Sequence, residues 1–211
     1  MVMDAARLAK DTPKSLKTRA RILDCAMQLI ADLGYHAATN AIIADAAGLT
    51  RGAMLYHFPT REALVEAAVA HVQAARSALF RAAADGLPPG TDVTEHAIDS
   101  YWELLHSTPF LAFGEFELAA RTEPAIAALL APAQAEFDRA QAGDHFLKIL
   151  HAGAGPRFQA SRDLARFMLE GLARSTLTYD ADGRQKRLLM LIKRATHMLN
   201  RKGDVQDLWP D

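Results

Sequence analysis

The side chains of this sequence that could act in metal or covalent catalysis are few and isolated. Glu103 and His106 have the Glu-x-x-His spacing of one ligand pair in a di-iron helical bundle. Such a site needs a second Glu-x-x-His and two more glutamates, and no second copy of the motif exists. Cys25 is the only cysteine, which excludes a disulfide framework and a cysteine-built zinc site. We therefore expect no catalytic residue, no bound metal and no cofactor.

Recognition of a polyanion is indicated instead by residues 39–58, TNAIIADAAGLTRGAMLYHF. They predict two short helices, 40–47 and 51–58, with Thr39 as an N-cap and Gly48 in the turn between them. This pattern is typical of a helix-turn-helix, whose second helix enters the major groove of DNA. The small and apolar residues that would hold the two helices together are Ile43, Ala44, Ala47, Leu49, Met54 and Phe58.

Helical periodicity places Tyr56 on the face opposite Met54 and Phe58, with Gly52 and Ala53 beside it. Small residues next to an exposed tyrosine would let the helix approach the base edges, where Ala53 can touch a thymine methyl group. The polar side chains at the flanks of this face are those of Thr50, Arg51 and His57. They suit contacts to phosphates, and the arginine could alternatively reach a guanine. The residues alone also fit two short helices that only pack together, so both interpretations stay open at this point.

The wider context favours the DNA-binding interpretation. Residues 18–72 resemble the N-terminal DNA-binding domain of the tetracycline-repressor (TetR) family. The matching features are the leading helix ILDCAMQLIADLGY, the threonine cap, the AAGLTRGA turn, the YHFPTREAL junction and the long helix that follows. The resemblance implies a three-helix DNA-binding domain, joined by that long helix to a helical domain that binds an effector and dimerises.

The resemblance also implies which residues contact DNA. The sequence departs from the family at two positions, because Leu55 stands where tyrosine is usual and Ile42 replaces a frequent charged residue. The implied phosphate contacts are Asn40, Thr50, Tyr56, His57 and Arg61, and the implied base contacts are Arg51, Gly52 and Ala53; with Thr39 they form the predicted DNA-binding set.

Charge is distributed unevenly along the 211 residues, whose net charge is −1. Residues 1–61 carry eight basic and five acidic side chains, whereas residues 85–145 carry two basic and eleven acidic ones. A basic head on a non-basic body favours a polyanion bound at one end. The acidic middle favours a cationic ligand over an anionic one. The basic segment 10–21 is interpreted either as a solvated tail or as an arm that reaches the DNA backbone or minor groove.

Helical periodicity dominates the whole chain, and no sustained strand alternation occurs, so an all-α fold is predicted. Helices are expected at about 15–33, 40–47, 51–58, 61–84, 92–107, 109–121, 124–150, 161–179 and 184–200, with the strongest break in composition at 85–90. We expect a DNA-binding domain over 1–60 and an effector-binding and dimerisation domain over 61–211. No apolar run could span a membrane and the start has no apolar signal segment, so a cytoplasmic protein without a membrane partner is expected.

Aromatic residues are dense in the middle of the chain, where Phe110, Phe113 and Phe116 form one stripe and Tyr101 and Trp102 belong to another. These stripes fit an ordinary core or a ligand cavity between helices, and the resemblance favours the cavity. The residues expected to line it or to orient an effector are Trp102, His106, Phe110, Phe113, Phe116, His145 and Met168, with Glu115 as a further polar candidate.

The last two expected helices are apolar on more than one face, which indicates a second packing partner. Their stripes are Leu164, Phe167, Met168, Gly171, Leu172 and Ser175, then Leu188, Leu191, Ile192, Ala195 and Leu199, with Leu169, Leu177, Leu189 and Met198 lying off them. The resemblance implies that these helices form the interface of a two-fold homodimer, the symmetry that a palindromic operator requires. The alternative is burial entirely within one chain.

These observations together predict a homodimeric one-component transcriptional regulator that binds double-stranded DNA. We expect a repressor that leaves a palindromic operator when a small molecule binds, and no enzymatic activity. Two rivals from other classes are a helical enzyme that metabolises small molecules and a ligand carrier without a DNA function. Turnover or bound iron would support the first rival, and failure to bind any DNA would support the second.

Overall fold

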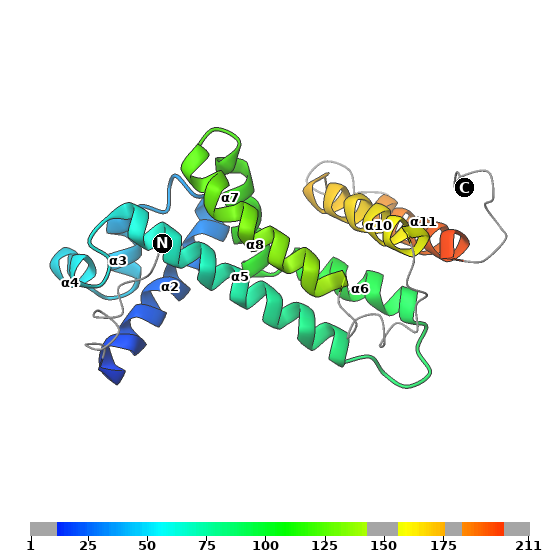
Figure 1. Cartoon of the computed structure of the whole chain (residues 1–211), viewed down its shortest axis with the longest axis horizontal. Helices are drawn as coiled ribbons and strands as arrows, with labels where there is room; N and C mark the ends of the chain where they lie inside the picture. The colour runs from blue at the N-terminus through cyan, green and yellow to red at the C-terminus, as the bar shows by residue number, and fades with distance from the viewer. Residues whose placement is uncertain (1–11, 143–155, 176–182, 201–211) are drawn as a thin grey trace. The chain divides into compact units, whose positions relative to one another are not determined.

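The computed structural model describes residues 12–142, 156–175 and 183–200, and these residues form helices joined by short turns. The helices are α2 Pro13–Leu33, α3 Asn40–Ala46, α4 Arg51–His57, α5 Arg61–Asp85, α6 Val93–Leu105, α7 Thr108–Ala120, α8 Pro124–Ala142, α10 Pro156–Ser175 and α11 Arg184–Asn200 (Figure 1). The predicted all-α fold is confirmed. None of the helices in the described ranges combines the length and the apolarity that crossing a bilayer requires.

The chain divides into two compact units. Unit 1 contains the chain up to Arg76 together with Thr108–Gln134, and unit 2 contains Ser77–Ser107 together with the chain from Ala135 onward. Helix α5 contributes its first part to unit 1 and its end to unit 2. The predicted domains 1–60 and 61–211 describe a functional division, which stays a prediction.

The first helix, α2, buries one apolar stripe in unit 1, as its periodicity predicts. Ile22, Ala26 and Ile30 are buried in the core, and α2 packs against α7. Leu33 is 51% exposed, because the helix ends there. Gly34 follows with a φ of +86°, and its N–H donates to the Ile30 carbonyl. A glycine, which adopts a positive φ without strain, thus follows the end of the helix.

The predicted helix-turn-helix is present as α3 and α4. Gly48 between them has a φ of +64°, the left-handed conformation that glycine adopts without strain, and the next N–H donates to the Ala44 carbonyl at 2.9 Å. The expected apolar contacts form, because Ile43, Ala44, Ala47, Met54 and Phe58 are all buried, and Leu49 packs against the same cluster.

A threonine caps the start of helix α5. The Thr60 hydroxyl accepts a hydrogen bond from the Ala63 N–H at 3.1 Å. Hydrogen bonds from its own backbone N–H and from Thr60 lower the pKa of Glu62, an anion in the first helical turn, where it is favoured. Further along, the unit 1 part of the helix buries Leu64, Val65, Ala68, Val69 and Val72 in the core that it shares with α7.

Unit 2 is built from the end of α5, α6, the end of α8, α10 and α11. Helix α10 packs against α6 and α11, and the buried apolar residues include Ile98, Tyr101, Leu169 and Ile192. Helix α10 starts at Pro156, earlier than the expected residue 161, which suits proline because the first helical N–H has no partner within the helix. The ends of the expected helices 124–150 and 161–179, with Leu177, lie outside the described residues.

The face of α10 that packs inside unit 2 differs from the apolar stripe that the sequence predicted for this helix. Ser161, Ala165 and Leu169 are buried, whereas Leu164 and Phe167 are exposed. The sequence stripe therefore identified an apolar face of the helix, but not the face that packs inside this chain. On α11, Ile192 is buried as expected, and Leu191 is exposed.

Candidate nucleic-acid interface

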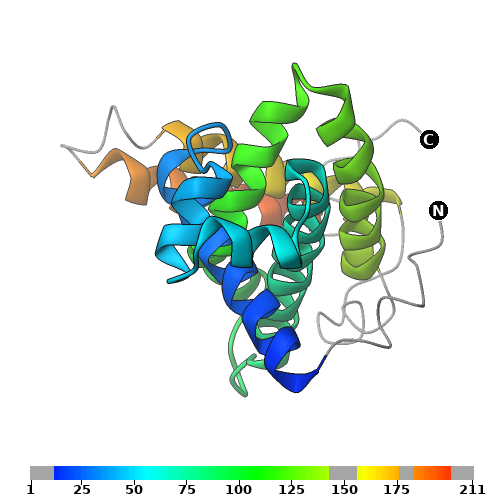
Figure 2. The ribbon, with the colours of Figure 1, turned by 90° about the vertical axis from the view of Figure 1, so that its left-hand side faces the viewer.

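The face of α4 that the sequence assigned to DNA is turned outward. Tyr56 is 75% exposed, whereas Met54 and Phe58 are 2% and 1% exposed. Arg51 and Gly52 are also exposed, and Ala53 is half-buried. Figure 2 looks onto the end of unit 1 that carries α3 and α4. The helix therefore presents small residues and one aromatic side chain on its outer face, a surface that can approach base edges closely.

Two threonines fix the starts of α3 and α4. The Thr39 hydroxyl oxygen accepts from the Ile42 N–H at 3.4 Å, and the Thr50 hydroxyl oxygen accepts from the Ala53 N–H at 3.2 Å. A hydroxyl that accepts in this way keeps its own proton, which it can donate to a phosphate oxygen. Both residues thus combine a capping role with a position suited to the DNA backbone.

The end of α4 is fixed by a residue that the sequence interpretation did not single out. Arg19 on α2 donates from Nη1 to the His57 carbonyl at 2.6 Å, and its guanidinium carbon lies 4.3 Å from the centre of the Phe58 ring. A cation at the C-terminal end of a helix is favoured by the helix dipole. The signal was present in the sequence, since Arg19 lies three residues before the buried Ile22 and so shares its face of α2.

Arg61 and Asn40, both expected at phosphates, are hydrogen-bonded to each other. The Arg61 Nη1 donates to the Asn40 Oδ1 at 3.2 Å and to the Ala38 carbonyl at 2.7 Å, and Nη2 donates to the Tyr35 carbonyl at 3.1 Å. Arg61 therefore ties the start of α5 to the loop before α3. The phosphate contacts of these two residues, like those of the other predicted DNA-binding residues, stay predictions.

A polar hollow of about 350 Å³ lies beside the start of α3 in unit 1. The His36 Nε2 lies 3.4 Å from the Glu123 Oε1 at its rim, and Thr39, Asn40 and Arg61 line it. Burial raises the pKa of Tyr35, which also lines the hollow; the Glu123 carboxylate adds to the rise, and the Arg61 cation opposes it. Tyr35 is thus held neutral beside the expected phosphate contacts.

The residues expected at an effector lie in both compact units. Phe110, Phe113 and Phe116 are buried in unit 1, where the Arg76 guanidinium carbon lies 3.6 Å from the centre of the Phe113 ring. The remaining described members, Trp102, His106 and Met168, belong to unit 2, and His145 lies outside the described residues.

In unit 2, the His106 ring packs edge-on against Trp102 at a centroid distance of 4.6 Å, and its Nδ1 lies 2.7 Å from the Trp102 carbonyl oxygen. His106 is exposed, as is Glu103. The predicted effector set therefore stays a prediction. Among the described residues, no group of three or more His, Cys, Asp or Glu side chains could hold a metal ion.

Comparisons with known proteins agree with this geometry. Residues 22–68 match the model of a family described as bacterial regulatory proteins, tetR family. The chain is 29% identical over 119 residues to the HTH-type transcriptional regulator UidR of Escherichia coli K12, an alignment that covers 54% of this chain and 57% of UidR. It is 40% identical over 58 residues to the HTH-type transcriptional repressor KstR2 of Rhodococcus jostii, covering 28% of each chain.

The chain thus spans little more than half the length of UidR. A Saccharomonospora viridis protein solved in complex with choline has a similar structure, with a TM-score of 0.64 and 18% identity over 85% of this chain and 95% of the other. At this identity the likeness shows a common fold.

Proposed function

The chain belongs to the TetR family of bacterial regulatory proteins, and on this premise we propose that it is a transcriptional regulator that reads DNA with α4. The observation that carries the proposal is the outer face of α4, where exposed Tyr56 stands beside Gly52 and Ala53. Buried Met54 and Phe58 anchor the opposite face in the core of unit 1. A helix anchored in this way can enter a major groove without rearrangement of its support.

We expect the regulator to act as a homodimer on a palindromic operator. The exposed large apolar residues of α10 and α11 are Leu164, Phe167, Leu188, Met190, Leu191 and Met198. Several exposed large apolar side chains on two neighbouring helices suit an interface, which here should bury more than about 1,000 Å² in total. Light scattering of the full chain at micromolar concentration is expected to give the mass of a dimer, and a monomer would contradict this part of the proposal.

Release of the operator by a small molecule is the proposed mode of regulation. Helix α5 runs from the helix-turn-helix region into unit 2, so it is the physical link between a ligand in unit 2 and α4. An effector that favours an unsuitable spacing of the two recognition helices would weaken operator binding by the coupling free energy between the sites. The choline in the Saccharomonospora viridis structure supports a ligand site within this fold.

A role as an enzyme or as a carrier without a DNA function is the alternative. The curated relatives UidR and KstR2 are transcriptional regulators, which favours the regulator. Selection of DNA from a random pool with the purified chain separates the possibilities. Enrichment of one site made of two inverted halves is expected, and a pool without enrichment at any salt concentration would contradict the proposal.

Two substitutions in α4 then test which residue reads sequence. If Arg51 reads a base, Arg51→Ala is expected to weaken binding to the selected site by about 1–3 kcal/mol and to relax the preference at one position per half-site. If it holds a phosphate, the loss is the same on all sequences and the salt dependence becomes shallower. Tyr56→Ala is expected to weaken all sequences evenly. Arg81→Ala, which removes an equal charge from an exposed position of α5, is the matched control.

A further inference from the structure

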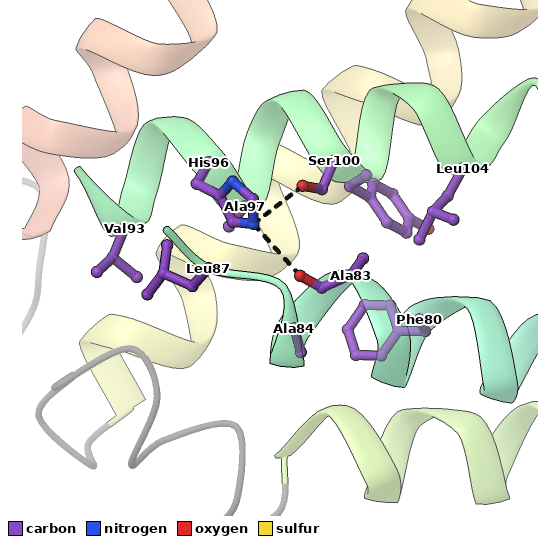
Figure 3. A pocket seen from close by; sticks show the side chains of 10 residues that line it. Phe80, Ala83, Ala84, Leu87, Val93, His96, Ala97, Ser100 and Leu104 are labelled. Carbon is purple, nitrogen blue, oxygen red and sulfur yellow. Dashed lines mark hydrogen bonds between the residues drawn. The ribbon is translucent and has the colours of Figure 1, made fainter. Parts of the chain in front are cut away.

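Unit 2 contains a small pocket where the end of α5 faces α6 (Figure 3). Phe80 and Ala84 of α5 form one wall, and Ala97 and Leu104 of α6 belong to the other. Its volume is about 40 Å³. Because one water molecule needs about 10–15 Å³ of such space, the pocket has room for a short hydrocarbon branch or for part of one ring. None of the residues that we expected at an effector lines it.

The walls of this pocket are apolar and uncharged. Among the described residues that line it, none is an aspartate, glutamate, lysine or arginine. A carboxylate or an ammonium group would therefore lose its hydration here without gaining a counter-ion, at a large cost in free energy. This feature argues against a charged ligand in the pocket, including the cationic ligand that the acidic segment 85–145 favoured.

One polar pair stands in the otherwise apolar lining. The His96 Nε2 lies 3.3 Å from the Ser100 Oγ and 3.3 Å from the Ala83 carbonyl oxygen, and Figure 3 shows its ring between them. Both distances are longer than the usual 2.9–3.0 Å of an N–H···O hydrogen bond. A single ring nitrogen either donates to the carbonyl or accepts from the hydroxyl, so it cannot satisfy both partners at once. The pair thus has hydrogen-bonding capacity left for a hydroxyl group of a ligand.

The third polar residue of the lining, Tyr101, is engaged elsewhere. Its hydroxyl donates to the Glu170 Oε1 of α10 at 2.8 Å, and the same oxygen accepts from the Arg166 Nε at 2.8 Å. The tyrosine therefore offers the pocket its ring and not its hydroxyl. It also connects the pocket wall to α10, the helix whose outer face carries exposed Phe167.

We propose that this pocket binds the apolar end of a small neutral alcohol or phenol, with the ligand hydroxyl hydrogen-bonded to His96 and Ser100. As the site of the effector, it rests on the proposed regulatory function. A neutral ligand suits the uncharged walls, a single hydroxyl suits the polar pair, and the small volume excludes a bulky polycyclic ligand from the interior. Tyr101 and Glu170 then transmit occupancy of the pocket to α10.

Calorimetry with phenol, toluene and benzoate tests the proposal on the full chain without DNA. Phenol is expected to bind, toluene to bind about tenfold more weakly because it lacks the hydrogen bond, and benzoate to show no measurable binding. Benzoate binding as tight as phenol binding would overturn the proposal, because the same ring would then enter with its charge. Absence of phenol binding at millimolar concentration would also overturn it.

Two variants locate the binding site. Ala97→Leu places a larger apolar side chain in the pocket and is expected to weaken phenol binding at least tenfold, whereas undiminished binding would place the phenol elsewhere. Ser100→Ala removes one hydroxyl and keeps the shape of the pocket. Ser100→Ala is expected to lower the affinity for phenol and to leave the affinity for toluene unchanged. If the variant and the native chain bind phenol equally well, the proposed role of Ser100 is overturned. This test holds even if Ala97→Leu does not fold.

DNA binding by the same preparation separates this proposal from the proposed function. If the chain binds its selected DNA but not phenol, the proposed regulatory function is supported and the proposed ligand site is refuted. If the chain binds phenol, Ala97→Leu weakens that binding and no DNA is bound, the proposed ligand site is supported and the proposed regulatory function is refuted. If both hold, phenol is expected to lower the affinity for the selected DNA.

Discussion

The two compact units of this protein are stabilised in different ways. Unit 1 has one continuous apolar core, in which residues from α2 to α5 meet α7 and α8, and it includes the anchors Met54 and Phe58 of α4. In unit 2, polar links join the helices, as between Tyr101 and Glu170, and large apolar residues such as Phe167 stay exposed. A filled apolar core permits few alternative packings, whereas a single hydrogen bond such as that of Tyr101 adds only about 0.5–1.5 kcal/mol. Unit 1 thus holds the candidate DNA-binding helix on a filled core, and the exposed Phe167 of unit 2 suits the proposed dimer interface.

The largest expected effect comes from opening the core of unit 1. Phe58→Ala removes a side chain that is 1% exposed and is expected to lower the free energy of unfolding by about 3–5 kcal/mol. Urea unfolding followed by circular dichroism measures this loss. Tyr56→Ala, on the opposite face of the same helix, is the matched control and should change stability by no more than about 0.5 kcal/mol. Similar losses in both variants would mean that α4 is not anchored as described.

The next effect concerns the exposed apolar face of unit 2. Phe167 is 63% exposed in the single chain, and Phe167→Ala is expected to weaken the dimer by about 1–3 kcal/mol while leaving the helical content unchanged. Sedimentation at several concentrations gives the dissociation constant. Leu111→Ala removes an exposed apolar side chain of α7 in unit 1 and should leave the dimer intact. If only Leu111→Ala weakened the dimer, the interface would lie on unit 1, which would contradict the prediction.

A smaller effect is expected from the polar links of unit 2. Burial alone would lower the pKa of the Arg166 guanidinium, but its hydrogen bond to Glu170 raises that pKa above its usual value, so the guanidinium stays charged. Tyr101→Phe removes one hydrogen bond to this pair and is expected to cost about 0.5–1.5 kcal/mol. Faster hydrogen exchange of α10 amides, with unchanged exchange in α2, is the expected readout. Equal acceleration in both helices would show that the two units do not differ in this respect.

The smallest effect is a pH dependence confined to unit 1. Burial raises the pKa of Tyr35 above its ordinary value of 10.0, with the Glu123 carboxylate adding to the rise. The neutral side chain therefore contributes stability below its unfolded pKa, and this contribution is lost as pH rises through the folded pKa. Unfolding in urea at about pH 9 and about pH 11 is expected to show a larger loss for the native chain than for Tyr35→Phe. Parallel losses would contradict the assignment.

Local chemistry explains which features the sequence could predict. The cap at Thr39 and the turn at Gly48 depend on residues only a few positions away, and both are observed. The outward face of α4 followed from helical periodicity for the same reason. These features determine the presentation of the candidate interface.

Distant partners explain what the sequence could not predict. Arg19 contacts a carbonyl 38 residues away and Arg61 contacts one 23 residues away. The sequence interpretation instead placed Arg19 in a solvated tail or an arm, and the family resemblance placed Arg61 at a phosphate. Periodicity identifies an apolar face but not the neighbour that covers it. For that reason Phe113 and Phe116 could be placed on a stripe, but their burial in unit 1 could not be foreseen, and Leu169 rather than Phe167 faces inward on α10.

The contact between Arg19 and the end of α4 has a consequence for engineering regulators with new operator preferences. A graft that exchanges only residues 51–57 would transfer the side chains proposed to contact DNA but not the guanidinium that holds the last carbonyl of the helix. In a recipient without an arginine at the equivalent position, the transplanted helix would keep its side chains but lose the contact that fixes its orientation. The smallest segment to transfer with the proposed recognition helix is therefore α4 together with the turn of α2 that contains Arg19.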